Sequence, residues 1–267
     1  MVSSGQAESL WAGGLFIKSG AKYPAGSAVI MLRMEPSELM SGTPERQAFD
    51  DALMRACGAI GVSPSKEQRA RMFEHFRRVI ETNRHFNLTR ITSPADAAAK
   101  HYADSLVLLA TAWVQPEQPT HVLDVGTGAG FPAVPLAIMC PRWQITAVDG
   151  TGKKARFVAE TATVLGLANL RAIHSRGEDL ARKGGGPFDV IVVRAVGKIA
   201  EVLHGLRALI NPGTSLVFYK TDKMEPAELS DGICQAGRLG LLPAEPFGIE
   251  LPSPDGVMCR RLIRFGP

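Results

Sequence analysis

The sequence predicts an α/β fold in which a doubly wound, Rossmann-like sheet follows a small helical part. Beyond residue 117, short β-branched runs alternate with segments of helical period, which is typical of βαβ units and of a parallel sheet covered on both faces. A glycine-rich turn at 126–130 follows the first of these runs and precedes a helical segment. We therefore divide the chain into an irregular leader at 1–44, which we expect to be dispensable, a helical part at 45–116 and a Rossmann-like domain at 117–267.

Composition excludes several classes of protein. The chain has 267 residues, of which 45% are apolar and 21% charged, as in a globular protein rather than a fibrous or disordered one. Its densest apolar run, 106–114, is much shorter than the roughly 18 residues that a membrane-spanning helix needs, so we expect no membrane association. The apolar patch at 10–17 follows no basic residue, which argues against a secretory signal.

The four cysteines favour a cytoplasmic protein with reduced thiols. They are scattered along the chain, without a CxxC pair or the Cys/His spacing of a zinc site: Cys57, Cys140, Cys234 and Cys259. We therefore expect neither a disulfide framework nor a bound metal.

Positive charge is concentrated in one segment. The net charge is +4, and residues 64–90 carry seven basic and three acidic residues, a surplus as large as that of the whole chain. Such a segment is typical of a nucleic-acid contact, but also of a solvated helix face with internal ion pairs such as Glu74 with Arg78. Charge alone leaves both interpretations open.

Two helices are predicted ahead of the sheet. One runs over about 65–86, and the residues on its packed face are Met72, Phe73, Phe76, Val79, Ile80 and Asn83. The second begins at Ser93-Pro94, where serine can cap the helix and proline can occupy its first position, and continues to about Trp113.

The alternating region is predicted to contain five strands with four helices between them. The strands lie at 121–125, 144–149, 170–174, 189–193 and 215–219, and the helices at about 131–139, 152–166, 178–183 and 198–209. Two further strands are predicted at 238–246 and 257–265, joined by the Pro/Gly loop at 253–256 and paired antiparallel at one edge of the sheet.

The turn after the first strand has the pattern Gly126-x-Gly128-x-Gly130, and Pro132 is expected to be the first residue of the helix that follows. Glycine lets the backbone turn sharply and approach a ligand where a Cβ would collide. Asp124 lies two residues before this pattern, where its carboxylate repels a pyrophosphate but attracts the cationic amino group of a methionyl ligand. The sequence therefore favours S-adenosylmethionine over a dinucleotide. The alternative is a tight turn that binds no ligand.

Three further candidate residues follow the other strands. Asp149 ends the second strand, where a carboxylate can accept hydrogen bonds from both ribose hydroxyls, or can simply cap the following helix. Glu178 follows the third strand, where adenine contacts are expected. Arg194 follows the fourth strand, nearest to the transferable methyl group and the substrate.

Five motifs occur together, in order, over about residues 50–267. They are Phe86-Asn87-Leu88-Thr89-Arg90-Ile91, His101-x-x-Asp104-Ser105-Leu106, the loop 123–132 with 135–138, Lys153-Lys154-x-x-Phe157, and 189–195. In these motifs the chain resembles the glucose-inhibited division protein B family, bacterial methyltransferases of guanine N7 in 16S ribosomal RNA.

The resemblance implies the class I S-adenosylmethionine-dependent methyltransferase fold, with S-adenosylmethionine as cofactor and 16S rRNA or the small ribosomal subunit as partner. It also implies that five residues contact the cofactor: Gly126, Phe131, Gly177, Glu178 and Arg194.

The spacing of His101, Asp104 and Ser105 places their side chains on one helix face. A hydrolase triad is a weak interpretation, because three groups on one helix rarely orient a base against its nucleophile beside an oxyanion hole. The face either docks the helical part onto the sheet or shapes the substrate pocket. Candidate RNA contacts are Asn87, Arg90, His101, Ser105, Lys153 and Lys154, with Arg77, Arg78, Arg260 and Arg261 as further phosphate contacts.

Guanine N7 carries an in-plane lone pair and no proton, so its methylation needs no general base. We therefore expect no catalytic residue beyond alignment of the reactants by Arg194. Alternatives are a methyltransferase of another RNA, a small molecule or a protein, a non-catalytic nucleic-acid-binding module, or an NAD-dependent oxidoreductase. We expect a monomer.

Overall fold

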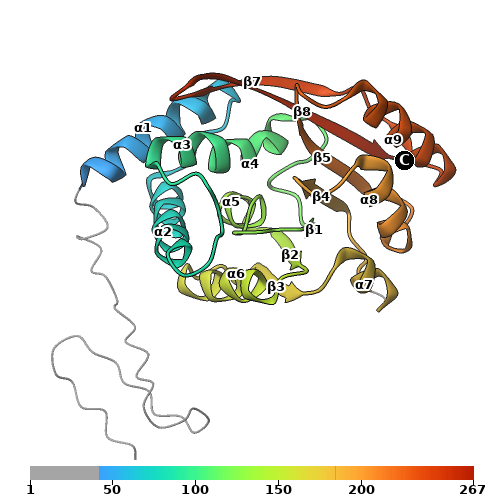
Figure 1. The fold of residues 1–267 in the computed structure, drawn as a ribbon, viewed down its shortest axis with the longest axis horizontal. Coiled ribbons are helices and arrows are strands. Elements are labelled where there is room, and N and C mark those ends of the chain that lie inside the picture. The colour runs from blue at the N-terminus through green and yellow to red at the C-terminus, as the bar shows by residue number, and fades with distance from the viewer. Residues whose placement is uncertain (1–41, 184) are drawn as a thin grey trace, which may run out of the picture. The chain divides into compact units, whose positions relative to one another are not determined.

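An eight-stranded sheet forms the centre of the computed structural model, which describes residues 42–183 and 185–267 (Figure 1). The strands are β1 (Thr120–Val125), β2 (Trp143–Asp149), β3 (Leu170–His174), β4 (Val190–Arg194), β5 (Ser215–Thr221), β6 (Leu242–Pro243), β7 (Phe247–Ser253) and β8 (Gly256–Gly266). Their order is β3-β2-β1-β4-β5-β8-β6, and β7 pairs with β8.

Strands β1 to β5 are parallel, which confirms the predicted sheet and its five parallel strands to within two residues at each end. The chain order reverses at β1, because β2 lies on one side of it and β4 on the other. In doubly wound sheets, ligands bind beyond the carboxyl ends of the strands at such a reversal. The glycine turn that follows β1 lies at this point.

The C-terminal part differs from the prediction. A helix that was not predicted, α9 (Pro226–Arg238), precedes the last strands. The predicted strand at 238–246 is wrong, because Arg238 ends α9 and only the short β6 lies within that range. The hairpin around 253–256 is formed by β7 and β8, and β8 pairs antiparallel with β5, so the antiparallel edge is confirmed with a different first strand.

The helices of the alternating region connect the parallel strands. They are α5 (Ala133–Met139), α6 (Gly152–Val164), α7 (Gly177–Arg182) and α8 (Ile199–Leu206), which continues as a 3₁₀ turn, η4 (Arg207–Leu209). Helix α5 begins one residue later than predicted, because Pro132 precedes the helix instead of being its first residue.

The helical part has one more helix than the periodicity predicted. Helix α1 (Pro44–Ala59) is capped by Thr43, so the predicted leader boundary at residue 44 falls inside a helix. The rest of the leader lies outside the described residues. Helix α2 (Lys66–Asn83) confirms the predicted basic helix, and Ser65 and Gln68 form a capping box at its start.

The second predicted helix begins as expected at Pro94, with Ser93 as its cap, but it is not a regular α-helix. It passes from α3 (Pro94–Ala97) through a π-helical turn, η2 (Ala98–Ala103), into α4 (Asp104–Leu106) and a 3₁₀ turn, η3 (Val107–Ala110). π-helical turns often occur at functional sites. This one carries His101 and leads directly into Asp104 and Ser105.

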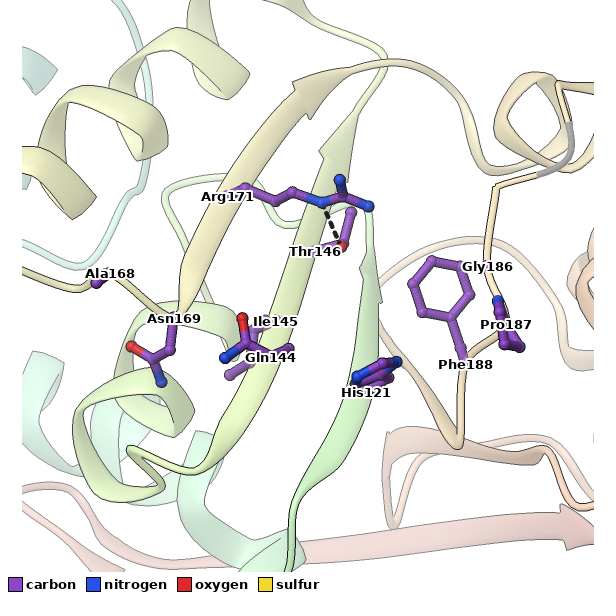
Figure 2. Close-up of a pocket in the computed structure, with 10 residues that line it drawn as sticks. All are labelled: His121, Gln144, Ile145, Thr146, Ala168, Asn169, Arg171, Gly186, Pro187 and Phe188. Atoms are coloured by element: carbon purple, nitrogen blue, oxygen red, sulfur yellow. Dashed lines mark hydrogen bonds between the residues drawn. The ribbon is translucent and has the colours of Figure 1, made fainter.

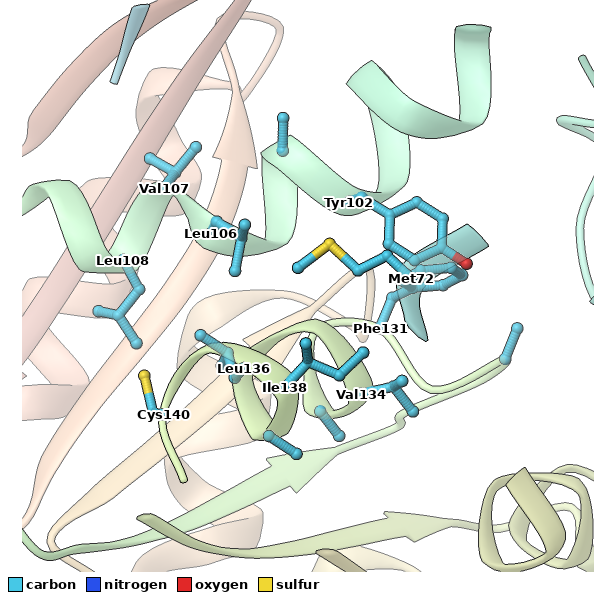
Figure 3. Close-up of a cluster of buried hydrophobic side chains, with 14 of the residues drawn as sticks. Met72, Tyr102, Leu106, Val107, Leu108, Phe131, Val134, Leu136, Ile138 and Cys140 are labelled. Atoms are coloured by element: carbon cyan, nitrogen blue, oxygen red, sulfur yellow. The ribbon is translucent and has the colours of Figure 1, made fainter. Parts of the chain in front are cut away.

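Each face of the sheet is covered by its own apolar cluster. On one face, Val122 and Ile145 pack with side chains of the helical part and of α5 and α6, as Figure 3 shows for Met72, Tyr102 and Leu136. The other face is covered by α8 and α9. The helical part therefore packs directly behind the glycine turn. Within the described residues, no helix has the length and apolar character needed to span a membrane.

Candidate functional site

The glycine loop, residues 126–130, lies between β1 and α5 and is bonded to β2. Gly126 and Thr127 donate their backbone N–H groups to the Val148 carbonyl, at 2.8 and 3.0 Å. Gly126, Gly128 and Gly130 all have positive φ angles, of 75°, 60° and 97°. Left-handed backbone is costly for residues other than glycine, which explains the pattern.

Two of the glycines differ in what surrounds them. A Cβ on Gly126 would lie 2.3 Å from Cγ2 of Val196, which packs over the loop after Ala195 takes a left-handed φ of 57°. A Cβ on Gly128 would meet no atom nearer than 4.0 Å. Gly126 is therefore required by the packing of the protein itself, whereas the backbone at Gly128 is open to a ligand.

Asp124 is fully buried at the end of β1. Its Oδ2 accepts a hydrogen bond from the Ala133 N–H at 3.1 Å, and its Oδ1 is also buried. Burial raises the pKa of this carboxyl to about 7. Hydrogen bonding from the Thr127 hydroxyl and the Ala133 N–H opposes this rise. The contact of Asp124 with the amino group of a methionyl ligand stays a prediction.

Asp149 connects β2 to the glycine loop. Its Oδ2 accepts from the Gly128 N–H at 3.0 Å, and its Oδ1 accepts from the Thr151 N–H at 2.7 Å. The second bond closes a turn ahead of α6, whose N-cap residue is Thr151 and which has no side-chain cap, so Asp149 does not cap this helix. A carboxylate has about four acceptor positions, so two bonds leave room for ribose hydroxyls. The ribose contact stays a prediction.

Gly177 and Glu178 begin α7, beside α8. A Cβ on Gly177 would lie 2.5 Å from Leu206 Cδ2, so this glycine permits close packing of the two helices. The Glu178 side chain is exposed and lies against Gly205 of α8. Neither residue has a described contact with the glycine loop, and their contacts with the cofactor stay predictions.

Phe131 is the centre of an aromatic cluster behind the glycine loop. Its ring stacks on His101 at 4.6 Å between ring centres and meets Tyr102 edge-on at 5.1 Å. The Arg194 guanidinium carbon lies 5.9 Å from the ring centre. The residue is 8% exposed, so it supports the loop from within the core.

Arg194 is anchored to the π-turn. Its Nη2 donates to the Lys100 carbonyl at 2.7 Å and lies 2.8 Å from Asp104 Oδ2, while its Nη1 donates to Ser105 Oγ at 3.2 Å. Asp104 is 2% exposed and also pairs with Arg260 of β8. One buried carboxylate thus joins β4, β8 and the helical part.

His101 and Ser105 do not form a hydrolase pair. Ser105 Oγ donates to the backbone carbonyl of His101 at 2.6 Å, and Nε2 of the His101 ring bonds with Thr89 Oγ1 at 2.8 Å. Burial and the Arg194 charge lower the pKa of His101 to about 3, so the ring is neutral. These contacts agree with the docking interpretation, and Ser105, fully buried, is not exposed to a substrate.

The other candidate RNA contacts lie at the surface. Asn87 and Arg90 are exposed on the loop between α2 and α3, and Asn83 shapes this loop by accepting the Leu88 and Thr89 N–H groups. Lys153 is exposed and Lys154 half-buried in the first turn of α6. Lys153 and Lys154 follow the carboxyl end of β2, and the RNA contacts of all four residues stay predictions.

Two arginines of α2 have intramolecular partners. Arg77 pairs with Glu74 at 3.2 Å, in place of the expected pair of Glu74 with Arg78. Arg78 Nε instead donates to Thr161 Oγ1 of α6 at 3.4 Å. Helix α2 is therefore partly tied to the sheet domain by its basic residues.

The sequence analysis missed His75, a buried residue of α2 that reaches the glycine loop. Nε2 of His75 lies 2.8 Å from the Ala129 carbonyl, and Nδ1 lies 3.0 Å from the Tyr102 hydroxyl. A lone histidine on the apolar face of a helix carries no distinctive pattern. Its position, one turn from Met72 and beside Phe76, was the only available signal.

A cleft of about 390 Å³ lies at the opposite ends of β1, β2 and β3, away from the glycine loop (Figure 2). It contains Arg171, whose Nε donates to Thr146 Oγ1 at 2.9 Å. Near the glycine-loop edge, a second cleft of about 570 Å³ is lined by residues that include Asp222, Arg260 and Arg261. Among the described residues, no group of three or more His, Cys, Asp or Glu side chains is placed to hold a metal ion.

Comparison with known proteins gives consistent matches. The family model GidB, described as rRNA small subunit methyltransferase G, matches residues 68–234. Ribosomal RNA small subunit methyltransferase G of Solibacter usitatus is 38% identical over 197 residues, which cover 72% of this chain and 87% of that protein. The protein of the same name from Bordetella avium is 34% identical over 222 residues, covering 82% of this chain and 95% of that protein.

Proposed function

The chain belongs to the GidB family of rRNA small subunit methyltransferases, and from this premise we propose that it transfers a methyl group from S-adenosylmethionine to N7 of a guanine in 16S rRNA. The observation that carries the proposal is the glycine loop at the reversal point of the sheet. There, the buried carboxylate of Asp124 ends β1 next to the loop, whose backbone is open at Gly128.

The residues present fit S-adenosylmethionine. Asp124 would accept the amino group of the methionyl part, and Gly128 would let the ligand lie against the backbone. Asp149 has acceptor positions left for the ribose hydroxyls. The start of α7, at Gly177 and Glu178, would face the adenine. When bound, the cofactor supplies an electrophilic sulfonium methyl group.

The proposed reaction needs no general base, because of the chemistry of the acceptor atom. Guanine N7 attacks through its lone pair and has no proton to lose. His75 and His101, whose pKa values burial lowers to about 3, remain neutral. The chain contributes by orienting the reactants, which alone is worth several kcal/mol. Arg194 would do this indirectly, since its guanidinium holds the π-turn that lies against Phe131.

The substrate RNA would lie across the edge where β1, β2 and β4 end. Asn87, Arg90, Lys153 and Lys154 would contact phosphates there, and His101 would shape the pocket from within. A single-stranded loop costs less to unstack than a duplex, so an unpaired guanine is the favoured acceptor. We infer a monomer that acts in the cytoplasm on 16S rRNA or on the small subunit.

The experiment that tests the proposal is transfer of labelled methyl from S-adenosylmethionine to 16S rRNA, free and in small subunits. Label in the RNA supports a methyltransferase and contradicts a non-catalytic binding module. Label in protein or in a small molecule identifies a different acceptor. Titration with NADH, followed by nicotinamide fluorescence, tests the oxidoreductase alternative, for which we expect no binding.

A further inference from the structure

We propose that His75 of α2 is a positioning residue of the cofactor site, which holds the peptide group between Ala129 and Gly130 in the orientation that S-adenosylmethionine requires. The inference rests on the proposed function, because it assigns to the helical part a direct role in cofactor binding. It concerns a residue that touches the loop rather than the cofactor or the reacting atoms.

The contact is short and wholly buried. His75 is 0% exposed, and its Nε2 lies 2.8 Å from the Ala129 carbonyl oxygen. A carbonyl can only accept, so Nε2 carries the ring proton and donates it. Nδ1 is then the acceptor, and it receives the Tyr102 hydroxyl at 3.0 Å. Burial lowers the pKa of His75 to about 3, which keeps this single neutral tautomer over the physiological range.

One peptide group is thereby held at both ends. The Ala129 carbonyl and the Gly130 N–H belong to the same planar unit, so they can only rotate together. His75 holds the oxygen end, and the Gly130 N–H donates to the Thr127 carbonyl at 2.9 Å. Gly130 has a φ of 97° and no side chain to restrain it. A flexible glycine next to a ligand-binding backbone thus gains its orientation from an outside donor.

The loop is also held by the sheet and by the start of α5, where the Val134 N–H donates to the Gly130 carbonyl at 2.8 Å. Val148 accepts the Gly126 and Thr127 N–H groups, and Asp149 accepts the Gly128 N–H. The contact from His75 comes from the helical part. Without it, the Ala129 carbonyl would be buried with an unmet hydrogen bond, and rotating the peptide to find a new donor would change ψ of Ala129 and φ of Gly130 within the loop. The expected consequence is weaker cofactor binding rather than a general loss of fold.

The test compares three variants by calorimetric titration with S-adenosylmethionine and by thermal unfolding without it. His75→Phe keeps a ring that can pack on Phe131 but has no donor, and we expect its Kd to rise about tenfold. His75→Gln keeps an amide N–H near the position of Nε2, and we expect a Kd within about threefold of wild type. Phe73→Leu is the control, because it perturbs the same helix where α2 packs on Phe49. Its Tm should fall while its Kd stays unchanged.

The inference is overturned if His75→Phe binds within twofold of wild type, or if Phe73→Leu weakens binding as much as His75→Phe does. Should His75→Phe fail to fold, His75→Leu decides, because it also lacks a donor and leaves the buried site less crowded. We expect its Kd to rise about tenfold as well, and an unchanged Kd overturns the inference. A wild-type chain that does not bind S-adenosylmethionine would instead refute the proposed function, and this inference with it.

Discussion

The sheet holds the glycine loop mainly through backbone bonds, whereas the helical part is joined to the sheet and to the loop through side chains. On the sheet side, backbone N–H groups of Gly126 and Thr127 meet the Val148 carbonyl. On the helical side, individual side chains make the contacts, and the largest group is centred on Asp104 with Arg194 and Arg260. Backbone bonds follow from strand order and can persist through many changes of sequence. The bonds of the helical side depend on single residues. We therefore expect substitutions on the two sides to differ in their effects on stability and cofactor binding.

The largest expected effect is on the helical side, from Asp104→Ala. The carboxylate is 2% exposed, and its removal leaves Arg194 and Arg260 without their charge partner. Breaking a buried ion pair from one side should lower the free energy of unfolding by about 3–5 kcal/mol. Urea denaturation measures the loss.

The matched control is Asp255→Ala, which removes a carboxylate that is 74% exposed and pairs with Lys100 of the same π-turn. An exposed pair should contribute less than about 1 kcal/mol. Equal losses in the two variants would contradict the view that the buried carboxylate joins the helical part to the sheet.

The next effect is on the sheet side, from Gly128→Ala. This position has a φ of 60°, and no atom lies within 4 Å of an added Cβ except the Gly126 carbonyl at 4.0 Å. Strain should therefore cost about 1–2 kcal/mol. S-adenosylmethionine binding should weaken at least about tenfold, because the methyl group projects into the space offered to the ligand.

Gly166→Ala serves as the control for strain alone. Gly166 has a φ of 63° with nothing within 4 Å, and it lies after α6, away from the glycine loop. We expect a similar loss of stability with unchanged cofactor affinity. If both variants bound the cofactor equally well in calorimetry, the loop would not be the cofactor site.

The third effect is a pH dependence of stability, which differs between the sheet side and the helical side. Asp124 has its pKa raised from 3.8 to about 7, so the folded state binds its proton more tightly than the unfolded state does. Its contribution is therefore present at low pH and is lost as pH rises from about 4 to about 7, with a slope of at most about 1.4 kcal/mol per pH unit. A bound cation favours the ionised carboxylate, so cofactor affinity should rise over the same range.

The two buried histidines of the helical part act in the opposite direction. His75 and His101 have pKa values lowered from 6.5 to about 3, so their contribution is present above pH 6.5 and is lost as pH falls. The contribution of Asp124 to the free energy of unfolding is therefore measured as the difference between wild type and Asp124→Asn in urea denaturation at several pH values. Parallel curves for the two proteins would show that Asp124 does not titrate as described.

The smallest effect concerns the start of the helical part. We expect a chain that begins at Gly42 to keep the stability and cofactor affinity of the full chain. Within it, Thr43→Ala should cost about 1 kcal/mol, because the Thr43 hydroxyl accepts the Arg46 N–H at the start of α1. A large loss on truncation to Gly42 would show that the preceding segment contributes to the fold.

Much of the sheet side was predictable, because its signals are local. Alternation of β-branched runs with helical segments located the five parallel strands, with β3 placed to the residue. The glycine pattern with Asp124 located the loop. Helix α9 was missed although Leu229, Gly232 and Ala236 recur at helical spacing on its packed face and Pro226 marks its start. The misplaced strand before β7 followed from that omission.

The helical side was less predictable, because its contacts join residues that are far apart in sequence. Asp104 and Arg260 are separated by 156 residues, and nothing near either one indicates the pair. His75 shares a helical face with apolar residues and looks like part of a core. The π-turn at 98–103 follows from no residue preference in the sequence, and the resemblance to a family indicated the importance of His101 and Asp104 without their geometry.

The measurement that tests the central claim most directly is identification of the methylated atom in 16S rRNA. After transfer from S-adenosylmethionine, borohydride and aniline should cut the RNA at one guanine, because N7-methylguanine is sensitive to this treatment. The cut should be lost with Gly128→Ala and kept with Gly166→Ala. With RNA and S-adenosylmethionine both saturating, the single-turnover rate should vary little between about pH 6 and 8.5, since N7 has no proton to lose. Methyl label on an exocyclic amine or a hydroxyl, or a rate that rises about tenfold per pH unit, would contradict the account.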